Sequence, residues 1–175
     1  MKILETGAHL DQMIRQTRAH HVKLSSMADM KANMMLTVAS LMIPLSVRYV
    51  ADPGFHSAAV TMIGFCVLTV MLAAYSTMPK VPLRMRKGPS PDPEDPRLNI
   101  LFFGSFVGLD YAGFRHAMEG IMNDHNRTYE VQVREVYAMG QYLAQKKYRF
   151  VQLAYVSFIT GVVLSAAVYG LSSLF

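Results

Sequence analysis

Three stretches of the chain contain no Asp, Glu, Lys or Arg, and they constrain the fold more than any other feature of the sequence. They cover residues 32–47, 53–79 and 150–175. A helix needs about 20 mostly apolar residues to cross a bilayer, and the second and third stretches supply them. Both are apolar around the whole helical circumference, whereas a soluble surface helix carries a polar face. The sequence therefore predicts membrane helices over 57–78 and 150–173.

The first uncharged stretch is shorter than the other two. It reaches spanning length only if Arg48 extends to the far interface and the helix continues through Val50. Pro44 would kink such a helix, which membrane proteins tolerate when packing satisfies the freed carbonyl. We expect a first membrane helix over 32–51, with a re-entrant or interfacial segment as the alternative.

Length and composition limit the remaining possibilities. The chain has 175 residues, enough for about one domain. Its 52% of apolar residues excludes a disordered chain, and a lone Cys66 excludes an intramolecular disulfide. The first 31 residues are polar and mixed in charge, unlike a cleavable signal peptide, so all three segments are expected in the mature protein.

The basic residues lie almost entirely on one side of these segments. Sixteen of the 17 fall before residue 32 or between 79 and 149, with Arg48 as the exception. The turn ADPGFHS and the tail LSSLF contain none. The positive-inside rule therefore predicts a cytoplasmic N-terminus and insert, a tight external turn at Asp52-Pro53-Gly54 and an external C-terminus.

The cytoplasmic parts show two helical stripes. One runs from Leu10 to Ala28 in a predicted amphipathic helix over 1–31, and the other from Phe114 to Leu143 in a predicted helical region over 98–149. Six of the eight prolines lie in 79–97, which predicts a linker with a basic start that either attracts anionic lipid or only sets topology. The segment 98–110 suits a short strand, a packed turn or an interfacial segment. The predicted fold is an all-α membrane protein with three transmembrane helices and amphipathic cytoplasmic helices that form an antiparallel or otherwise bundled layer.

Few residues suggest catalysis or metal binding. The adjacent pair His20-His21 lacks the i, i+4 spacing of a helical metal chelate, so no metal site is expected. No nucleophile elbow, phosphate loop or dinucleotide fingerprint occurs, and we expect no enzyme activity. The insert carries 11 basic and 8 acidic residues without a dense basic stripe, which argues against binding of bulk nucleic acid.

Basic and aromatic side chains do alternate along the second stripe. Arginines can clamp a phosphate and tyrosine rings can stack on a base, although a solvated helix with a partly buried tyrosine edge explains the same pattern. The candidates for phosphate binding are Lys31, Arg115, Arg127 and Arg134, and those for stacking are Tyr129 and Tyr137.

Asp29 and Lys31 stand where the first membrane helix begins. Charges are costly there unless they are paired or reach the interface, and residues at i, i+2 do not face each other on a helix. Either Lys31 anchors the helix at the interface, or the pair makes a buried switch contact with the second cytoplasmic helix. Small residues at four-residue spacing, Gly161, Ser165 and Ala166 among them, further suggest a homo-oligomer through the third span.

Three phrases resemble a known family. LSSMADMKANMMLTVAS resembles the S-x-x-D-x-K-A motif of the Pycsar effector transmembrane proteins of bacterial antiphage defence. The phrase FFGSFVGLDYAGFRHAMEGIMND and the later VYAMGQYLAQKKYRFVQLAYVSFITGVV resemble the second half of the same domain. The matching motif residues are Asp29, Lys31 and Ala32 in the first phrase, and Gly140, Leu143, Lys147 and Tyr148 in the last.

The resemblance implies an effector that senses cyclic CMP or cyclic UMP, made by a partner pyrimidine nucleotide cyclase during infection. The activated effector would impair the inner membrane and cause abortive infection. It implies no cofactor other than this activating ligand. The alternative is a constitutive membrane scaffold whose cytoplasmic helices recruit a protein partner. A transporter subunit is disfavoured because the spans lack an ionisable pair near their centres.

Overall fold

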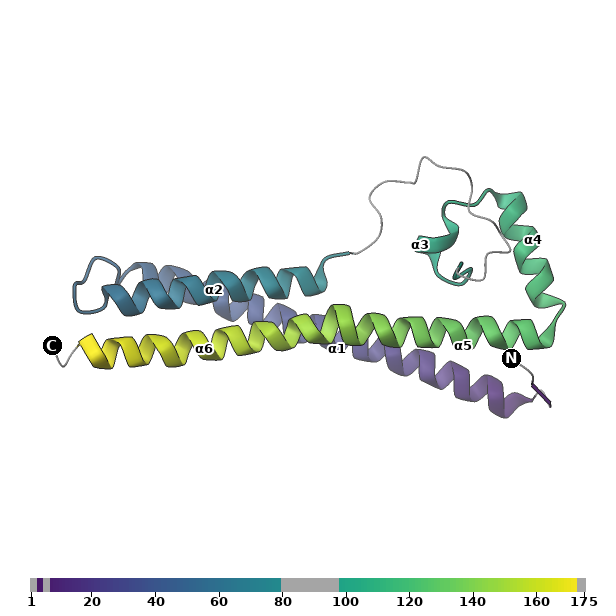
Figure 1. Ribbon diagram of the computed structural model, residues 1–175, viewed down its shortest axis with the longest axis horizontal. Helices are drawn as coiled ribbons and strands as arrows, with labels where there is room; N and C mark the ends of the chain where they lie inside the picture. Colours follow the sequence, from purple (N-terminus) through teal and green to yellow (C-terminus); the bar gives the residue numbers. More distant parts are fainter. Residues whose placement is uncertain (1–2, 5–6, 80–97, 173–175) are drawn as a thin grey trace. The chain divides into compact units, whose positions relative to one another are not determined.

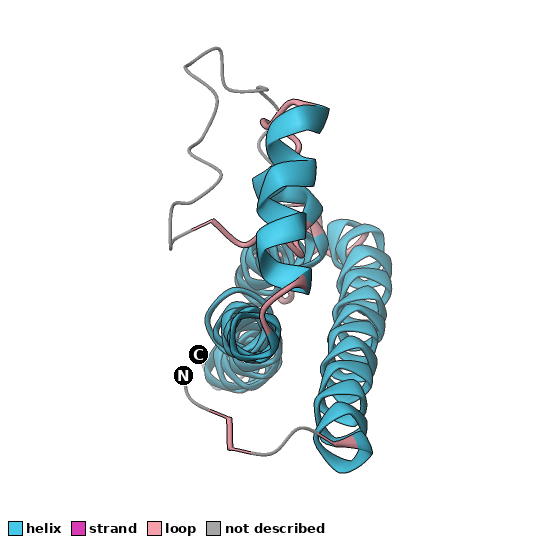
Figure 2. Cartoon of the chain, turned by 90° about the vertical axis from the view of Figure 1, so that its right-hand side faces the viewer, coloured by secondary structure: helices cyan, strands magenta, loops and turns pink. Residues whose placement is uncertain are grey.

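The computed structural model describes residues 3–4, 7–79 and 98–172, and regular secondary structure in these ranges is entirely helical (Figure 2). Three continuous helical stretches are long and apolar enough to cross a membrane, which confirms the predicted class. The predicted linker over 79–97 lies, except for Pro79, outside the described residues. The elements in chain order are α1 (Ala8–Val47), α2 (His56–Thr77), α3 (Phe103–Phe106), α4 (Tyr111–Met122), α5 (His125–Tyr142), the π-helix η1 (Leu143–Tyr148) and α6 (Arg149–Ser172).

The chain divides into two compact units. Unit 1 takes in the described residues up to Val22 and those from Pro79 to Gln141. Unit 2 takes in Lys23–Met78 and the described residues from Tyr142 onward. Unit 2 therefore contains the apolar helices, and unit 1 contains most of the amphipathic ones.

The long helix α1 runs for 40 residues with Pro44 inside it. It ends at Val47 and does not continue through Val50, because turns follow in which the Asp52 carboxylate accepts a hydrogen bond from the Gly54 amide at 3.0 Å. Residues 32–47 provide only 16 uncharged positions before this end. A membrane span within α1 must therefore reach back to Lys31.

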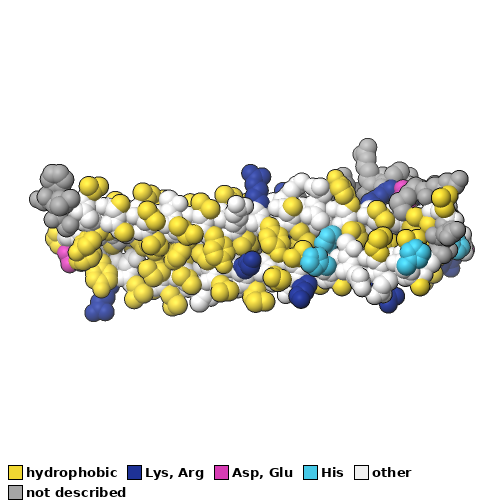
Figure 3. Space-filling view, turned by 90° about the horizontal axis from the view of Figure 1, so that it is seen from below, with side chains coloured by type: hydrophobic (Ala, Val, Ile, Leu, Met, Phe, Trp, Pro, Cys, Tyr) yellow, Lys and Arg dark blue, Asp and Glu magenta, His cyan; other side chains and the backbone are white. Residues whose placement is uncertain are grey.

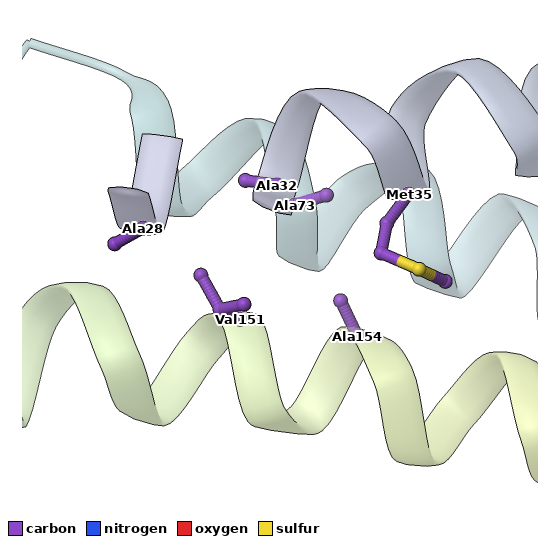
Figure 4. Close-up of a cluster of buried hydrophobic side chains, with 6 residues drawn as sticks. All are labelled: Ala28, Ala32, Met35, Ala73, Val151 and Ala154. Atoms are coloured by element: carbon purple, nitrogen blue, oxygen red, sulfur yellow. The ribbon is translucent and has the colours of Figure 1, made fainter. Parts of the chain in front are cut away.

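The core of unit 2 brings together α1, α2 and α6. One cluster packs Ala28, Ala32 and Met35 of α1 against Ala73 of α2 and against Val151 and Ala154 of α6 (Figure 4). Small side chains dominate this cluster, so the three helices can approach closely without the hydrophobic driving force that water supplies. Ala32 of the predicted motif is fully buried here.

The helices α2 and α6 run antiparallel and lie side by side (Figure 1). A Cβ added to Gly161 would overlap the Phe65 side chain, so only glycine permits this approach. Farther along the same seam Ser165 Oγ donates a hydrogen bond to the Ala58 carbonyl at 2.9 Å, and Thr69 is fully buried. Gly161 and Ser165, which the sequence assigned to an interface between subunits, thus pack within one chain.

The outer surface of these helices is apolar. Figure 3 shows hydrophobic side chains spread over much of the displayed face. Large apolar side chains remain exposed on each helix, among them Leu41 of α1, Met71 of α2 and Ile159 of α6. Such surfaces suit contact with lipid rather than water.

Unit 1 packs around α4 and α5. Ile100, Ala117 and Ile121 form a buried cluster against which Phe114 and Val131 pack. The segment 98–110 is a packed turn with the short helix α3, not the strand considered as one alternative. The break between α4 and α5 is capped by Asp124, whose carboxylate accepts from the Asn126 amide at 2.9 Å.

The N-terminal part of α1 packs alongside α5 in unit 1. The Tyr129 hydroxyl donates to Asp11 at 2.8 Å, and the Arg18 guanidinium binds Glu135 at 3.1 Å. The residue numbers of the bonded pairs increase together along α1 and α5. The two stripes therefore pack parallel to each other and not antiparallel.

Candidate functional site

A group of polar side chains meets inside unit 2, at one end of the apolar segments of α1, α2 and α6. We call Ser25, Asp29, Ser76 and Lys147 the polar node. Lys147 Nζ lies 2.6 Å from both carboxylate oxygens of Asp29 and 2.8 Å from Ser25 Oγ. The Lys147 side chain is 10% exposed, while that of Asp29 is 38% exposed. The Asp29 carboxylate thus pairs with the Lys147 ammonium, whose burial without a partner would cost free energy.

The π-helix η1 decides where Lys147 points. A π-turn shifts the hydrogen bonds to i→i+5 and inserts an extra residue, so side chains beyond it are rotated relative to a regular helix. η1 covers Leu143–Tyr148, so it contains the motif residues Leu143, Lys147 and Tyr148. Ser76 of α2 donates to the Lys147 carbonyl at 3.3 Å, and the Tyr148 hydroxyl donates to the Leu24 carbonyl of α1 at 3.1 Å.

Three of the other motif residues, Ala32, Gly140 and Leu143, pack against neighbouring groups. Leu143 is buried at the start of η1, and Ala32 belongs to the core cluster of Figure 4. Gly140, in unit 1, faces the His21 ring: a Cβ there would come within 3.6 Å of His21 Cε1. His21 Nδ1 is buried and has no hydrogen-bond partner among the described residues.

One interpretation of the sequence was a contact between the Asp29 region and the second cytoplasmic helix. Asp29 does pair with Lys147, which follows the end of the second stripe at Leu143. The resemblance singled out Lys147, but the sequence did not show that Lys147 rather than its neighbour Lys146 would pair with Asp29. A regular helix and a π-turn place the two lysines differently, and no sequence signal announces the π-turn. Lys31 does not share the contact and stays exposed.

The ligand candidates in unit 1 have varied surroundings. Tyr129 is 7% exposed and its hydroxyl is bound to Asp11, so its ring could stack on a base only if unit 1 opened. Arg134 pairs with Glu130 at 3.1 Å along the same helix. Tyr137 is 68% exposed and accepts from Gln141 Nε2 at 3.3 Å. Arg115 and Arg127 are exposed, and the described contacts do not gather them with Tyr137 around one pocket.

The environment of Tyr129 also changes its acidity. Its hydrogen bond to the Asp11 carboxylate raises the pKa of the phenol above the ordinary value of 10.0, and burial and the Asp11 charge act in the same direction. A neutral phenol can donate to Asp11, whereas a phenolate would repel it. Tyr129 thereby ties α5 to α1 within unit 1.

Comparison with known proteins decides the family. The Pycsar effector protein domain matches residues 12–172, nearly the whole chain. The chain belongs to the Pycsar effector family. No curated protein and no solved structure matches it, so the assignment rests on this domain match. Membership confirms the resemblance seen in the sequence and supports a role as a transmembrane effector of antiphage defence.

The described residues contain no group of three or more His, Cys, Asp or Glu side chains able to hold a metal ion. Within these ranges the one cysteine, Cys66, is a buried free thiol in α2.

Proposed function

We propose that this Pycsar effector is switched by a cyclic pyrimidine nucleotide, cyclic CMP or cyclic UMP, and then impairs the inner membrane to cause abortive infection. The observation that carries the proposal is helical continuity. α1 runs without a break from residues of unit 1 into the membrane-spanning length of unit 2, and α5, η1 and α6 follow one another as one helical stretch. A change in unit 1 can therefore be passed along two helices to the membrane.

The polar node is the proposed two-state element. In the closed arrangement it binds α1 to η1 through Asp29 and Lys147 and holds α2 through Ser76. Opening would separate these groups and expose them to water or headgroups. Converting about 1% to about 99% open requires about 5.5 kcal/mol of differential ligand affinity, which several subunits can share.

We also infer a homo-oligomer. Three helices cannot enclose a pore alone, and exposed apolar faces remain on α1, α2 and α6 after the chain has folded. The nucleotide would come from a partner cyclase. The candidate phosphate and stacking residues in unit 1 are Arg115, Arg127, Arg134 and Tyr137, with Tyr129 available after opening; Lys31 lies in unit 2 and is not grouped with them.

The direct test uses purified full-length protein in detergent with cyclic CMP, cyclic UMP and cyclic AMP. We expect one pyrimidine nucleotide to shift the melting temperature or the oligomeric state, with cyclic AMP as the matched control. In cells, co-expression with an active cyclase should depolarise the membrane, whereas a catalytically dead cyclase should not.

Absence of both the shift and the depolarisation would sink the proposal. A stable co-purifying protein without any nucleotide response would instead favour the scaffold. The site assignment has its own test: if Arg115→Ala, Arg127→Ala and Arg134→Ala all kept nucleotide affinity, the ligand would bind elsewhere.

A further inference from the structure

An open groove lies beside the polar node in unit 2. It is lined by Lys31 of α1, by Tyr148 of η1, and by Val151, Gln152 and Tyr155 of α6. Its volume is about 530 Å³. A groove of this size can hold a polar headgroup and the first part of an apolar chain.

Three polar groups on this groove are available for a ligand. The side chains of Lys31, Gln152 and Tyr155 make no hydrogen bond or ion pair with another described residue. The acid closest to Lys31 along the chain is Asp29, and Lys147 binds both of its oxygens. The Lys31 charge therefore lacks a counterion among the described residues.

The position of the groove relative to the apolar segments limits what can fill it. Lys31 immediately precedes the uncharged stretch of α1, and Arg149 immediately precedes that of α6. Gln152 and Tyr155 already lie inside the uncharged stretch of α6. Unpaired polar groups cost several kcal/mol in hydrocarbon, so they need a partner from the membrane surface. Lysine and tyrosine are both suited to the headgroup level.

Beyond Lys31, the same side of α1 carries exposed apolar side chains. Met34 and Val38 follow Lys31 at i+3 and i+7, which places all three on one side of α1. Met34 is 59% exposed and Val38 is 42% exposed. A ligand with an anionic head at Lys31 would thus find an apolar track for its chain.

We propose that this groove binds the phosphodiester headgroup of an anionic membrane phospholipid. The Lys31 ammonium pairs with a phosphate oxygen, the Tyr155 hydroxyl and the Gln152 amide donate to the headgroup, and an acyl chain follows Met34 and Val38. A cyclic nucleotide carries the same singly charged phosphodiester but has no apolar tail, so the apolar track favours the lipid. The inference does not depend on the proposed nucleotide switch.

The test measures lipid retention by full-length protein purified in detergent, with added phosphatidylglycerol as the probe. Lys31→Gln should weaken retention about fivefold, the effect expected for loss of one lysine near anionic lipid. Lys23→Gln removes the same charge from the same helix two turns away and should leave retention unchanged. Lys31→Arg should keep it.

Two further arms separate the possible sources of phosphate. Gln152→Leu and Tyr155→Phe should each lower retention while the melting temperature stays near that of the parent protein, and cyclic CMP or cyclic UMP should not displace the lipid. Equal retention by Lys31→Gln and Lys23→Gln would overturn the proposal. Displacement by a nucleotide, with loss of nucleotide affinity in Lys31→Gln, would also overturn it and assign the groove to the nucleotide phosphate.

Discussion

At the scale of single residues, Lys147 is the most constrained charge in the described part of unit 2. Its ammonium is almost fully buried and is held by Asp29 and Ser25. Burying an ion pair contributes little net stability, but removal of one partner leaves the other as an unpaired buried charge. The pair therefore favours one arrangement of α1 against η1 and makes departures from it costly.

We predict that Lys147→Met lowers the free energy of unfolding by about 1–3 kcal/mol, because the Asp29 carboxylate is left partly buried and unpaired. The double variant Asp29→Leu with Lys147→Met should recover most of this loss, since no charge then remains to be satisfied. Thermal or denaturant unfolding in detergent measures both, with Lys23→Met as the exposed control. Additive losses in the double variant would contradict the coupling.

The raised pKa of Tyr129 gives a prediction in the alkaline range. The unfolded chain loses this proton near pH 10.0, while the folded chain keeps it to higher pH. The stabilisation is therefore complete below pH 10.0 and is lost as pH rises through the native pKa. Between pH 8 and 11 the melting temperature of the parent should fall more steeply than that of Tyr129→Phe. Tyr137→Phe, at an exposed position, should follow the parent; equal slopes for all three would count against the Asp11 bond.

At the scale of elements, the closest approach in unit 2 is between α2 and α6. Side chains of one or two heavy atoms, such as Ser157 and Ser165, line the α6 side of this seam. Buried hydroxyls satisfy their hydrogen-bonding capacity on carbonyls such as those of Phe65 and Ala58. Packing density and short hydrogen bonds thereby replace the hydrophobic effect that is missing within a bilayer.

Gly161→Leu should separate α2 from α6, because even a Cβ at this position overlaps Phe65. We expect a loss of about 1–3 kcal/mol, typical of overpacking in a tightly packed core. Gly170→Leu is the matched control on the same helix, where a Cβ meets nothing within 4 Å. Melting temperatures in detergent compare the two; similar losses would show that the seam is not the cause.

At the scale of the whole molecule, the distribution of charge predicts the orientation in the membrane. The turn between α1 and α2 lacks lysine and arginine, apart from Arg48 at its start, and the residues that precede α1's apolar stretch are rich in them. From this asymmetry we expect the turn outside the membrane and the N-terminus inside.

Labelling of intact cells with a membrane-impermeant maleimide tests this orientation. In a Cys66→Ser background, Gly54→Cys should react from outside, whereas Gln16→Cys should react only after permeabilisation. Both native residues are exposed, so accessibility within the fold does not bias the comparison. Labelling of Gln16→Cys in intact cells would reverse the proposed topology.

The sequence by itself determined the class of protein and its membrane segments. Uncharged length, helical periodicity and the positions of lysine and arginine are local properties, and each predicts structure without knowledge of partners. The motif residues were also visible, since Asp29 and Lys147 lie in phrases that resemble the family. The ends of the helices were harder to predict from the sequence. The end of α1 at Val47 depends on the turn around Asp52, and the conformation of 98–110 depends on burial of Ile100 against α4.

Only the tertiary structure decided which polar groups meet. Asp29 and Lys147 are 118 positions apart, and the π-turn that aims Lys147 changes hydrogen bonding without a distinctive composition. The same holds for Gly161 and Ser165, whose small size allows close packing against any helix; the fold shows that this helix is α2 of the same chain. Patterns along a helix specify what a face can contact, and the arrangement of neighbouring helices in space specifies what it does contact.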